Sequence, residues 1–62
     1  MDKNRIAQMK RALKKYGQDK CKRAYELNEE GNGASTIGYE LDLTTNQAYA
    51  SIDAYRTFLE LN

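Results

Sequence analysis

Histidine is absent from the chain and cysteine occurs once, at Cys21, and both facts restrict the chemistry available to the protein. Without histidine, the sequence lacks a common zinc ligand and the side chain used most often as a general acid or base. A single cysteine cannot form an internal disulfide. Cys21 is expected to be a small residue of the core, and a lone free thiol is compatible with a reducing cytoplasm.

Long apolar runs and strand patterns are also missing. No stretch approaches the roughly 20 apolar residues of a membrane-spanning helix, and no apolar signal-peptide core follows the charged N-terminus. β-branched residues are few, and no segment alternates apolar and polar residues over four or more positions. The composition therefore favours a soluble cytoplasmic protein, and the fold class that it predicts is all-α.

The acidic residues do not form a catalytic set. Glu29 lies beside Glu30, and Glu40 lies near Asp42, but residues this close in a helix point in different directions. The sequence has neither a glycine-rich phosphate loop nor a cluster with metal-ligand spacing. It therefore predicts a protein that is not an enzyme and that has no metal and no cofactor.

The chain is short, and its 62 residues are expected to form a single domain, 1–62. A chain of this length buries only about 60% of the surface that its unfolded form exposes, so its core is small. A homodimer is expected, because self-association would cover additional apolar surface. The shared residues would be those at the C-terminal end, or part of an N-terminal stripe formed by Ile6, Met9 and Leu13.

Basic and acidic residues are separated along the chain. Residues 1–23 hold nine of the ten basic residues and two acidic ones, a formal charge of about +7, whereas residues 24–62 carry about −6. A basic segment of this kind can bind the phosphates of nucleic acid. It can equally pair with the acidic half of the same molecule or of a neighbour.

Apolar spacing predicts four helices, at about 3–16, 19–30, 34–41 and 45–61. Gly17 fits the C-cap of the first helix, although a helix that continues through this single glycine is an alternative. Asp19 is expected to cap the second helix. The inward stripe of the last helix is predicted to contain Ala48, Ile52, Tyr55 and Leu59.

The beginning of the last helix is the most completely specified point of the sequence. Thr44 precedes Gln47 by three residues, which is the spacing of a capping box. The third helix must then end at about Asp42, and so short a connection forces two helices to cross steeply. A bulky side chain at the crossing would clash, and Gly38 has no side chain.

Segment 34–52 resembles the two-helix unit of the helix-turn-helix regulators of bacteria and phages, and with the preceding helix and loop the resemblance covers about residues 20–55. Gly38 matches the small residue at the helix crossing. Family members usually have glycine in the turn, where this chain has Asp42, a residue that tolerates a left-handed conformation. The matching apolar positions are Ile37, Leu41, Leu43, Ala48 and Ile52.

This resemblance implies a small sequence-specific DNA-binding protein, a transcriptional regulator of phage or mobile-element type, with double-stranded DNA as its partner. Helix 45–61 would enter the major groove, where asparagine can bind adenine and threonine can contact a base or a methyl group. The expected base contacts are Thr45, Asn46 and Tyr49. The expected contacts to the DNA backbone are Lys10, Arg11, Lys14, Lys15, Lys20, Lys22, Arg23 and Thr44.

Two alternatives stay open at the level of sequence. The helical hairpin can belong to a small protein-interaction factor, for example one that binds transcription machinery without contacting DNA. A second register is also possible, because residues 15–27 resemble the first helix of some helix-turn-helix proteins. In that register the turn through Gly31 and Gly33 is longer than the usual unit has.

Overall fold

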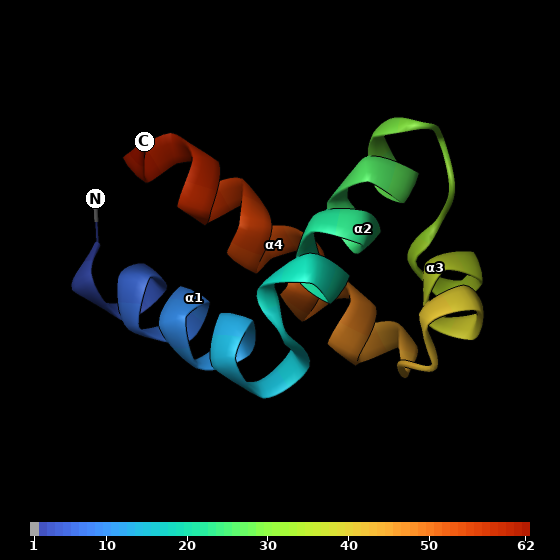
Figure 1. The fold of residues 1–62 in the computed structure, drawn as a ribbon, viewed down its shortest axis with the longest axis horizontal. Coiled ribbons are helices and arrows are strands. Elements are labelled where there is room, and N and C mark those ends of the chain that lie inside the picture. Colours follow the sequence, from blue (N-terminus) through green and yellow to red (C-terminus); the bar gives the residue numbers. More distant parts are fainter. Residues whose placement is uncertain (1) are drawn as a thin grey trace.

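The structure, a computed structural model, describes residues 2–62, and within this range the chain forms four helices and no strand (Figure 1). They are α1 (Lys3–Tyr16), α2 (Gln18–Glu29), α3 (Ala34–Leu41) and α4 (Thr45–Leu61). The predicted all-α class and the four helices are confirmed, with α2 displaced by one residue from its expected bounds. None of the described helices combines the length and the apolar character needed to cross a membrane.

The connection between α1 and α2 is a single residue, Gly17. Its φ of 92° lies in the left-handed region, and its amide donates to the carbonyl oxygen of Leu13 at 3.0 Å. The predicted helix end is therefore confirmed, and α1 does not continue into α2. The prediction that Asp19 caps α2 is wrong, because Gly17 occupies the cap position. Asp19 lies in the first turn instead, where a negative charge stabilises the helix dipole.

Helix α4 is the centre of the molecule and packs against each of the other three helices. In Figure 1, α1 and α2 cover it along its length, and α3 lies against its beginning. One core cluster joins α2, α3 and α4 and consists of Ala24, Leu27, Ala34, Ile37, Ala48 and Ile52. A second cluster joins α1 to α4 and consists of Met9, Ala12 and Ala54, with Ile6, Leu13, Tyr16 and Phe58 packed around it.

The inward surface of α4 is wider than the predicted stripe. Ala48 and Ile52 are buried as expected, but Tyr55 is only half-buried and Leu59 is 43% exposed. Since helices cover α4 from more than one side, small and polar residues outside the stripe are enclosed as well. The buried residues that the stripe missed are Ser51, Ala54 and Thr57.

The buried hydroxyl groups of α4 both have hydrogen-bond partners. Ser51 Oγ donates to the carbonyl oxygen of Gln47 at 2.9 Å, and Thr57 Oγ1 accepts from Arg5 Nη2 at 2.9 Å. Arg5 also lies 3.8 Å from a carboxylate oxygen of Asp53 and 3.7 Å from one of Glu60. Arg5 therefore links the beginning of α1 to the second half of α4.

Cys21 is fully buried between the helices, which confirms that it is a core residue. Its Sγ donates to the carbonyl oxygen of Ala12, 3.8 Å away. Burial raises the pKa of the Cys21 thiol, and a hydrogen bond with Ser51 opposes the increase only in part. The thiol is therefore protonated at neutral pH and enclosed.

The crossing of α3 and α4 depends on Gly38. A Cβ atom at this position would lie 2.5 Å from the carbonyl oxygen of Leu43 and 3.3 Å from the carbonyl carbon and oxygen of Thr44. The backbone of the turn therefore approaches α3 more closely than any side chain would permit. Ile37 is buried beside this contact, whereas Leu41 packs at the edge of the core and Leu43 is only half-buried.

Substitution of Gly38 by alanine is expected to destabilise the protein by about 1–3 kcal/mol through overpacking. Alanine favours an ordinary helix interior over glycine by about 1 kcal/mol, so a loss of stability would identify the steric contact as its cause. Urea unfolding followed by circular dichroism measures the change. Gly33→Ser is the control, because a Cβ at Gly33 has no neighbour within 4 Å and serine is a favoured cap residue. Equal midpoints for the two variants would contradict the assigned role of Gly38.

Candidate functional site

A reciprocal pair of hydrogen bonds fixes the beginning of α4. Thr44 Oγ1 accepts from the backbone amide of Gln47 at 3.1 Å, and Gln47 Oε1 accepts from the backbone amide of Thr44 at 3.0 Å. The predicted capping box is therefore confirmed. Because its side-chain oxygen is engaged in the cap, Gln47 is less available for contact with another molecule than its exposed neighbours are.

The turn before the cap is formed without glycine. Asp42 has φ 58° and ψ 47°, which is the left-handed conformation, and it is the only non-glycine residue with positive φ among residues 2–62. The amide of Leu43 then donates to the carbonyl oxygen of Gly38 at 2.8 Å. Aspartate tolerates this conformation better than most residues, so the three residues 42–44 can connect α3 to α4 without a glycine.

The first half of α4 presents a face that no other helix covers, here called the outer face of α4. Tyr49 on this face is 61% exposed. Among residues 2–62, no partner forms a hydrogen bond with the side chains of Thr45, Asn46 or Tyr49. The outer face of α4 consists of the exposed residues Thr45, Asn46, Tyr49, Ala50 and Asp53.

A groove of about 330 Å³ separates the outer face of α4 from α1. Arg11 and Lys15 line the groove from α1, and Ala50 lines it from α4. Lys15 Nζ lies 5.5 Å from the centre of the Tyr16 ring, a cation–π distance, and Tyr16 also lines the groove. The structure therefore places two cations beside an unobstructed helix face whose only charged residue is Asp53. Gln8, which lines the same groove, was missed by the sequence analysis.

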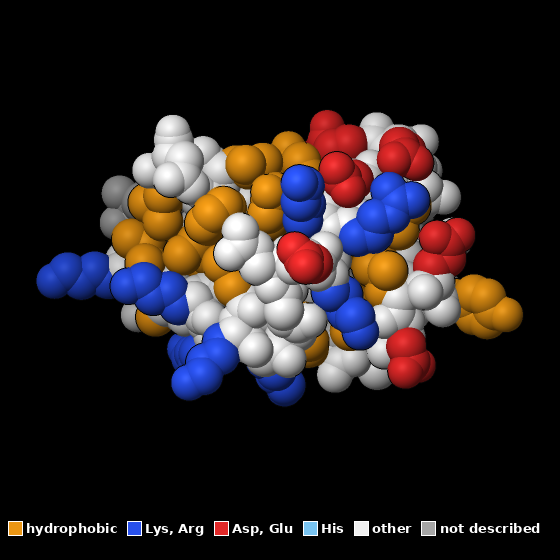
Figure 2. All heavy atoms as spheres, viewed as in Figure 1, with side chains coloured by type: hydrophobic (Ala, Val, Ile, Leu, Met, Phe, Trp, Pro, Cys, Tyr) orange, Lys and Arg blue, Asp and Glu red, His pale blue; other side chains and the backbone are white. Residues whose placement is uncertain are grey.

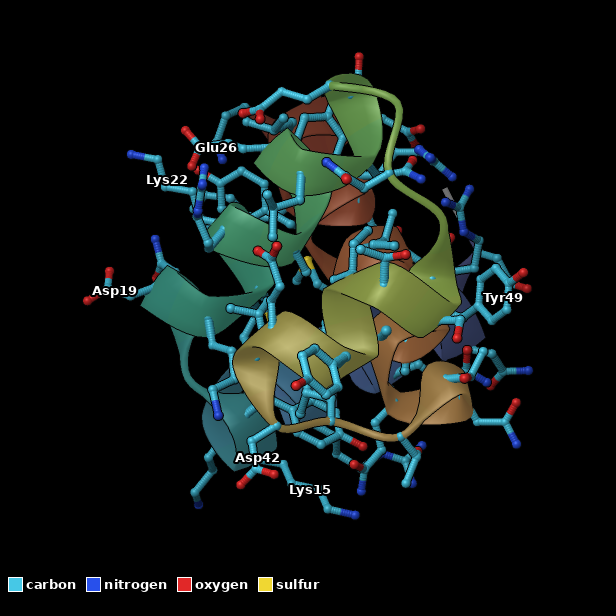
Figure 3. All side chains as sticks on the ribbon, turned by 90° about the vertical axis from the view of Figure 1, so that its right-hand side faces the viewer. Lys15, Asp19, Lys22, Glu26, Asp42 and Tyr49 are labelled. Atoms are coloured by element: carbon cyan, nitrogen blue, oxygen red, sulfur yellow. The ribbon has the colours of Figure 1, made fainter. Side chains whose placement is uncertain are left out.

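The other predicted backbone-contacting residues lie elsewhere. Lys10 and Lys14 are exposed on α1 but do not line this groove. Arg23 Nη1 lies 3.9 Å from a carboxylate oxygen of Glu26 and 3.6 Å from one of Glu30. In Figure 3, Lys22 lies on the side of the molecule opposite Tyr49. Lys22 and Arg23 are therefore not grouped with the outer face of α4, and the contact of Lys20, Lys22 and Arg23 with DNA stays a prediction.

Acidic side chains gather at one end of the molecule, whereas basic ones are spread more widely. Figure 2 shows most of the visible acidic side chains toward the far end of α2 and α3, with basic side chains over α1 and others among the acidic ones. Asp53 is the one carboxylate on the outer face of α4, and Arg5 is the nearby cation that partly offsets it. Both side chains are about half exposed, so solvent weakens this pairing.

No protein-family model, curated protein or solved structure matches this chain. A functional assignment therefore depends on the arrangement of α1, α3 and α4. The features that bear on it are the exposed outer face of α4, the fixed helix start and the adjacent cations.

Removal of the cap at Thr44 is expected to destabilise the protein by about 0.5–2 kcal/mol, because Thr44→Ala leaves the amide of Gln47 without its partner. Thr44→Ser keeps the hydroxyl and should stay close to the wild type. Thermal unfolding of the three proteins measures the difference. Thr45→Ala changes the neighbouring exposed threonine, and a loss as large as that of Thr44→Ala would contradict a specific capping effect.

Proposed function

We propose that α3, the turn at residues 42–44 and α4 act as a helix-turn-helix that inserts α4 into the major groove of double-stranded DNA, in a small sequence-specific transcriptional regulator. An α-helix fits the major groove, where each base pair presents a distinct set of donors and acceptors. The outer face of α4 is exposed over the first half of the helix, which is the part such a unit brings to the bases. The contact at Gly38 and the capping box support a rigid presentation of this half.

Base recognition is assigned to three side chains of the outer face of α4. The side-chain NH2 of Asn46 can donate to N7 of adenine while its side-chain oxygen accepts from the N6 amino group. Thr45 can contact a base or a thymine methyl group, and Tyr49 can add a hydroxyl or a ring contact. Their exposure and lack of internal partners support this role, because no existing hydrogen bond would be lost on binding.

The observation that carries the proposal is the groove shared by Arg11, Lys15 and Ala50. Phosphate contacts supply most of the nonspecific affinity of DNA-binding proteins, and they position the protein on the duplex. Since the outer face of α4 has no basic residue of its own, the cations must come from another element. Arg11 and Lys15 lie beside this face on α1, where they can contact the backbone next to an inserted α4. Thr44 at the helix start and the remaining basic residues stay as predicted secondary contacts.

Simultaneous replacement of Arg11 and Lys15 by alanine should weaken binding to all duplexes alike. Each lost phosphate contact lowers the slope of log K against log salt by about 0.9, so the slope should fall by up to about 1.8. The control is Lys22→Ala with Arg23→Ala, which removes the same charge from α2. Its slope should change less, because Lys22 lies opposite Tyr49 and Arg23 already has acidic neighbours. Fluorescence anisotropy at several salt concentrations measures both slopes.

Two results would contradict this assignment. If both double variants reduce the slope equally, total charge and not the position of Arg11 and Lys15 governs binding. If the wild-type protein binds no duplex at low salt, the outer face of α4 does not bind DNA, and a protein partner becomes the better explanation of the exposed hairpin.

Asn46→Ala should reduce affinity for the preferred site by about 1–3 kcal/mol, roughly a 5- to 150-fold change, with little effect on unrelated duplexes. Asn4→Ala is the matched control, because Asn4 is an exposed asparagine at the opposite end of α1 from the groove. Competition with genomic fragments and with a nonspecific duplex measures the selectivity. Equal losses of Asn46→Ala on all sequences would show that Asn46 does not contact bases.

A further inference from the structure

The groove between α1 and α4 has a wide part and a narrow part. The wide part measures about 330 Å³ and the narrow part about 70 Å³, and Gln8, Ala12 and Ala50 line both. Pockets for small ligands measure about 300–1,000 Å³, so the wide part can admit a group of several heavy atoms. We call the wide part the basic groove, and its lining residues are Gln8, Arg11, Ala12, Lys15, Tyr16 and Ala50.

Hydrogen-bond donors of α1 form one wall of the basic groove. Gln8, Arg11 and Lys15 follow one another at spacings of three and four residues, so they lie on one side of the helix. Guanidinium and ammonium groups have donors only, and the glutamine amide adds an NH2 group. All ion pairs within residues 2–62 involve Arg5 or Arg23, so neither cation of the basic groove has a carboxylate partner.

Alanine on both helices keeps the basic groove open. Ala12 of α1 is buried, and Ala50 is the residue that lines the groove from α4. A side chain longer than a methyl group at position 50 would extend into the space beside Arg11 and Lys15. Because Ala50 also belongs to the outer face of α4, a group bound in the basic groove would lie next to the surface that we assign to the bases.

Carboxylates lie near the basic groove but do not line it. Asp53 lines the narrow part, and its carboxylate lies 3.8 Å from Arg5 Nη2, which partly neutralises it. Asp42 is drawn near Lys15 in Figure 3, but no ion pair joins these two residues. An anion is therefore favoured in the wide part, at the end of the groove away from Asp53.

We propose that the basic groove binds a single phosphate group of the DNA backbone, held jointly by Arg11, Lys15 and Gln8. This inference rests on the proposed function and deepens it, because it assigns both cations to the same phosphate and gives Gln8 and Ala50 a role. Arginine can donate two parallel N–H groups to a phosphate, and lysine adds a compact charge. Gln8 donates from its amide, and the space left by Ala50 is filled by the phosphate.

Titration with inorganic phosphate, in the absence of DNA, tests the groove as a phosphate site. Backbone amide NMR of the full chain should show saturable shifts at residues 8–16 and 50, which sodium chloride of equal ionic strength does not produce. Ala50→Leu should weaken this binding at least tenfold, because the longer side chain fills the groove, whereas Ala50→Ser should keep it. The matched control is Ala7→Leu, because Ala7 is an exposed alanine of α1 that lines neither part.

The salt dependence of duplex binding tests whether one phosphate is shared. If Arg11 and Lys15 contact the same phosphate, the double alanine variant should lower the slope by about 0.9, whereas two separate contacts would lower it by about 1.8. Gln8→Leu should weaken binding to all duplexes severalfold, because it removes the amide donor. Gln18→Leu is its control, since Gln18 is an exposed glutamine of α2 outside the groove.

The results separate this inference from the proposed function. No phosphate-dependent shift on α1, equal phosphate binding by Ala50→Leu and Ala7→Leu, or a slope change near 1.8 would overturn the shared phosphate site, and duplex binding by α4 would still stand. Phosphate binding in the groove together with no duplex binding at low salt would overturn DNA as the source of the phosphate and the proposed function with it. Circular dichroism confirms that each variant is folded.

Discussion

The close approach of the turn backbone to Gly38 is the contact on which the rest of the arrangement depends. It allows α3 to lie directly against the beginning of α4, and the amide of Leu43 bonds back to Gly38 across it. Asp42 supplies the left-handed step, and the capping box of Thr44 and Gln47 then starts α4 at a defined residue. Backbone geometry at the turn therefore sets how α3 meets the beginning of α4, and the buried cluster around Ile37 and Ala48 packs behind this contact.

The remainder of the fold uses α4 as a common support. Small residues of α4 let three helices approach it closely. The buried hydroxyl groups of Ser51 and Thr57 are hydrogen-bonded, and among the described residues no buried side-chain nitrogen or oxygen atom lacks a hydrogen-bond partner. The cover on several sides of α4 also decides which residues of α1 and α2 lie beside its outer face. α1 reaches the border of the outer face of α4 with Arg11 and Lys15, whereas Lys22 of α2 lies on another side of the molecule. The basic residues of the N-terminal half are therefore divided between two faces.

Local signals in the sequence predicted the features that depend on a few neighbouring residues. The Gly17 turn, the left-handed Asp42 and the capping box follow from backbone preferences over three or four positions, and the helix bounds follow from these signals together with apolar spacing. Burial at Ser51, Ala54 and Thr57 could not be predicted in this way, because it depends on how many helices surround α4. The role of Arg5 depends on residues about fifty positions away. Composition likewise placed all basic residues of the N-terminal half together, and only the fold separates Arg11 and Lys15 from Lys22.

Backbone amide NMR of the labelled protein during titration with duplex DNA tests the central claim most directly. The account predicts that resonances of the first half of α4 and of the α1 residues around Arg11 and Lys15 shift together, while those around Lys22 and Glu26 on α2 change little. Shifts confined to α2, with α4 residues 45–53 unaffected, would contradict it.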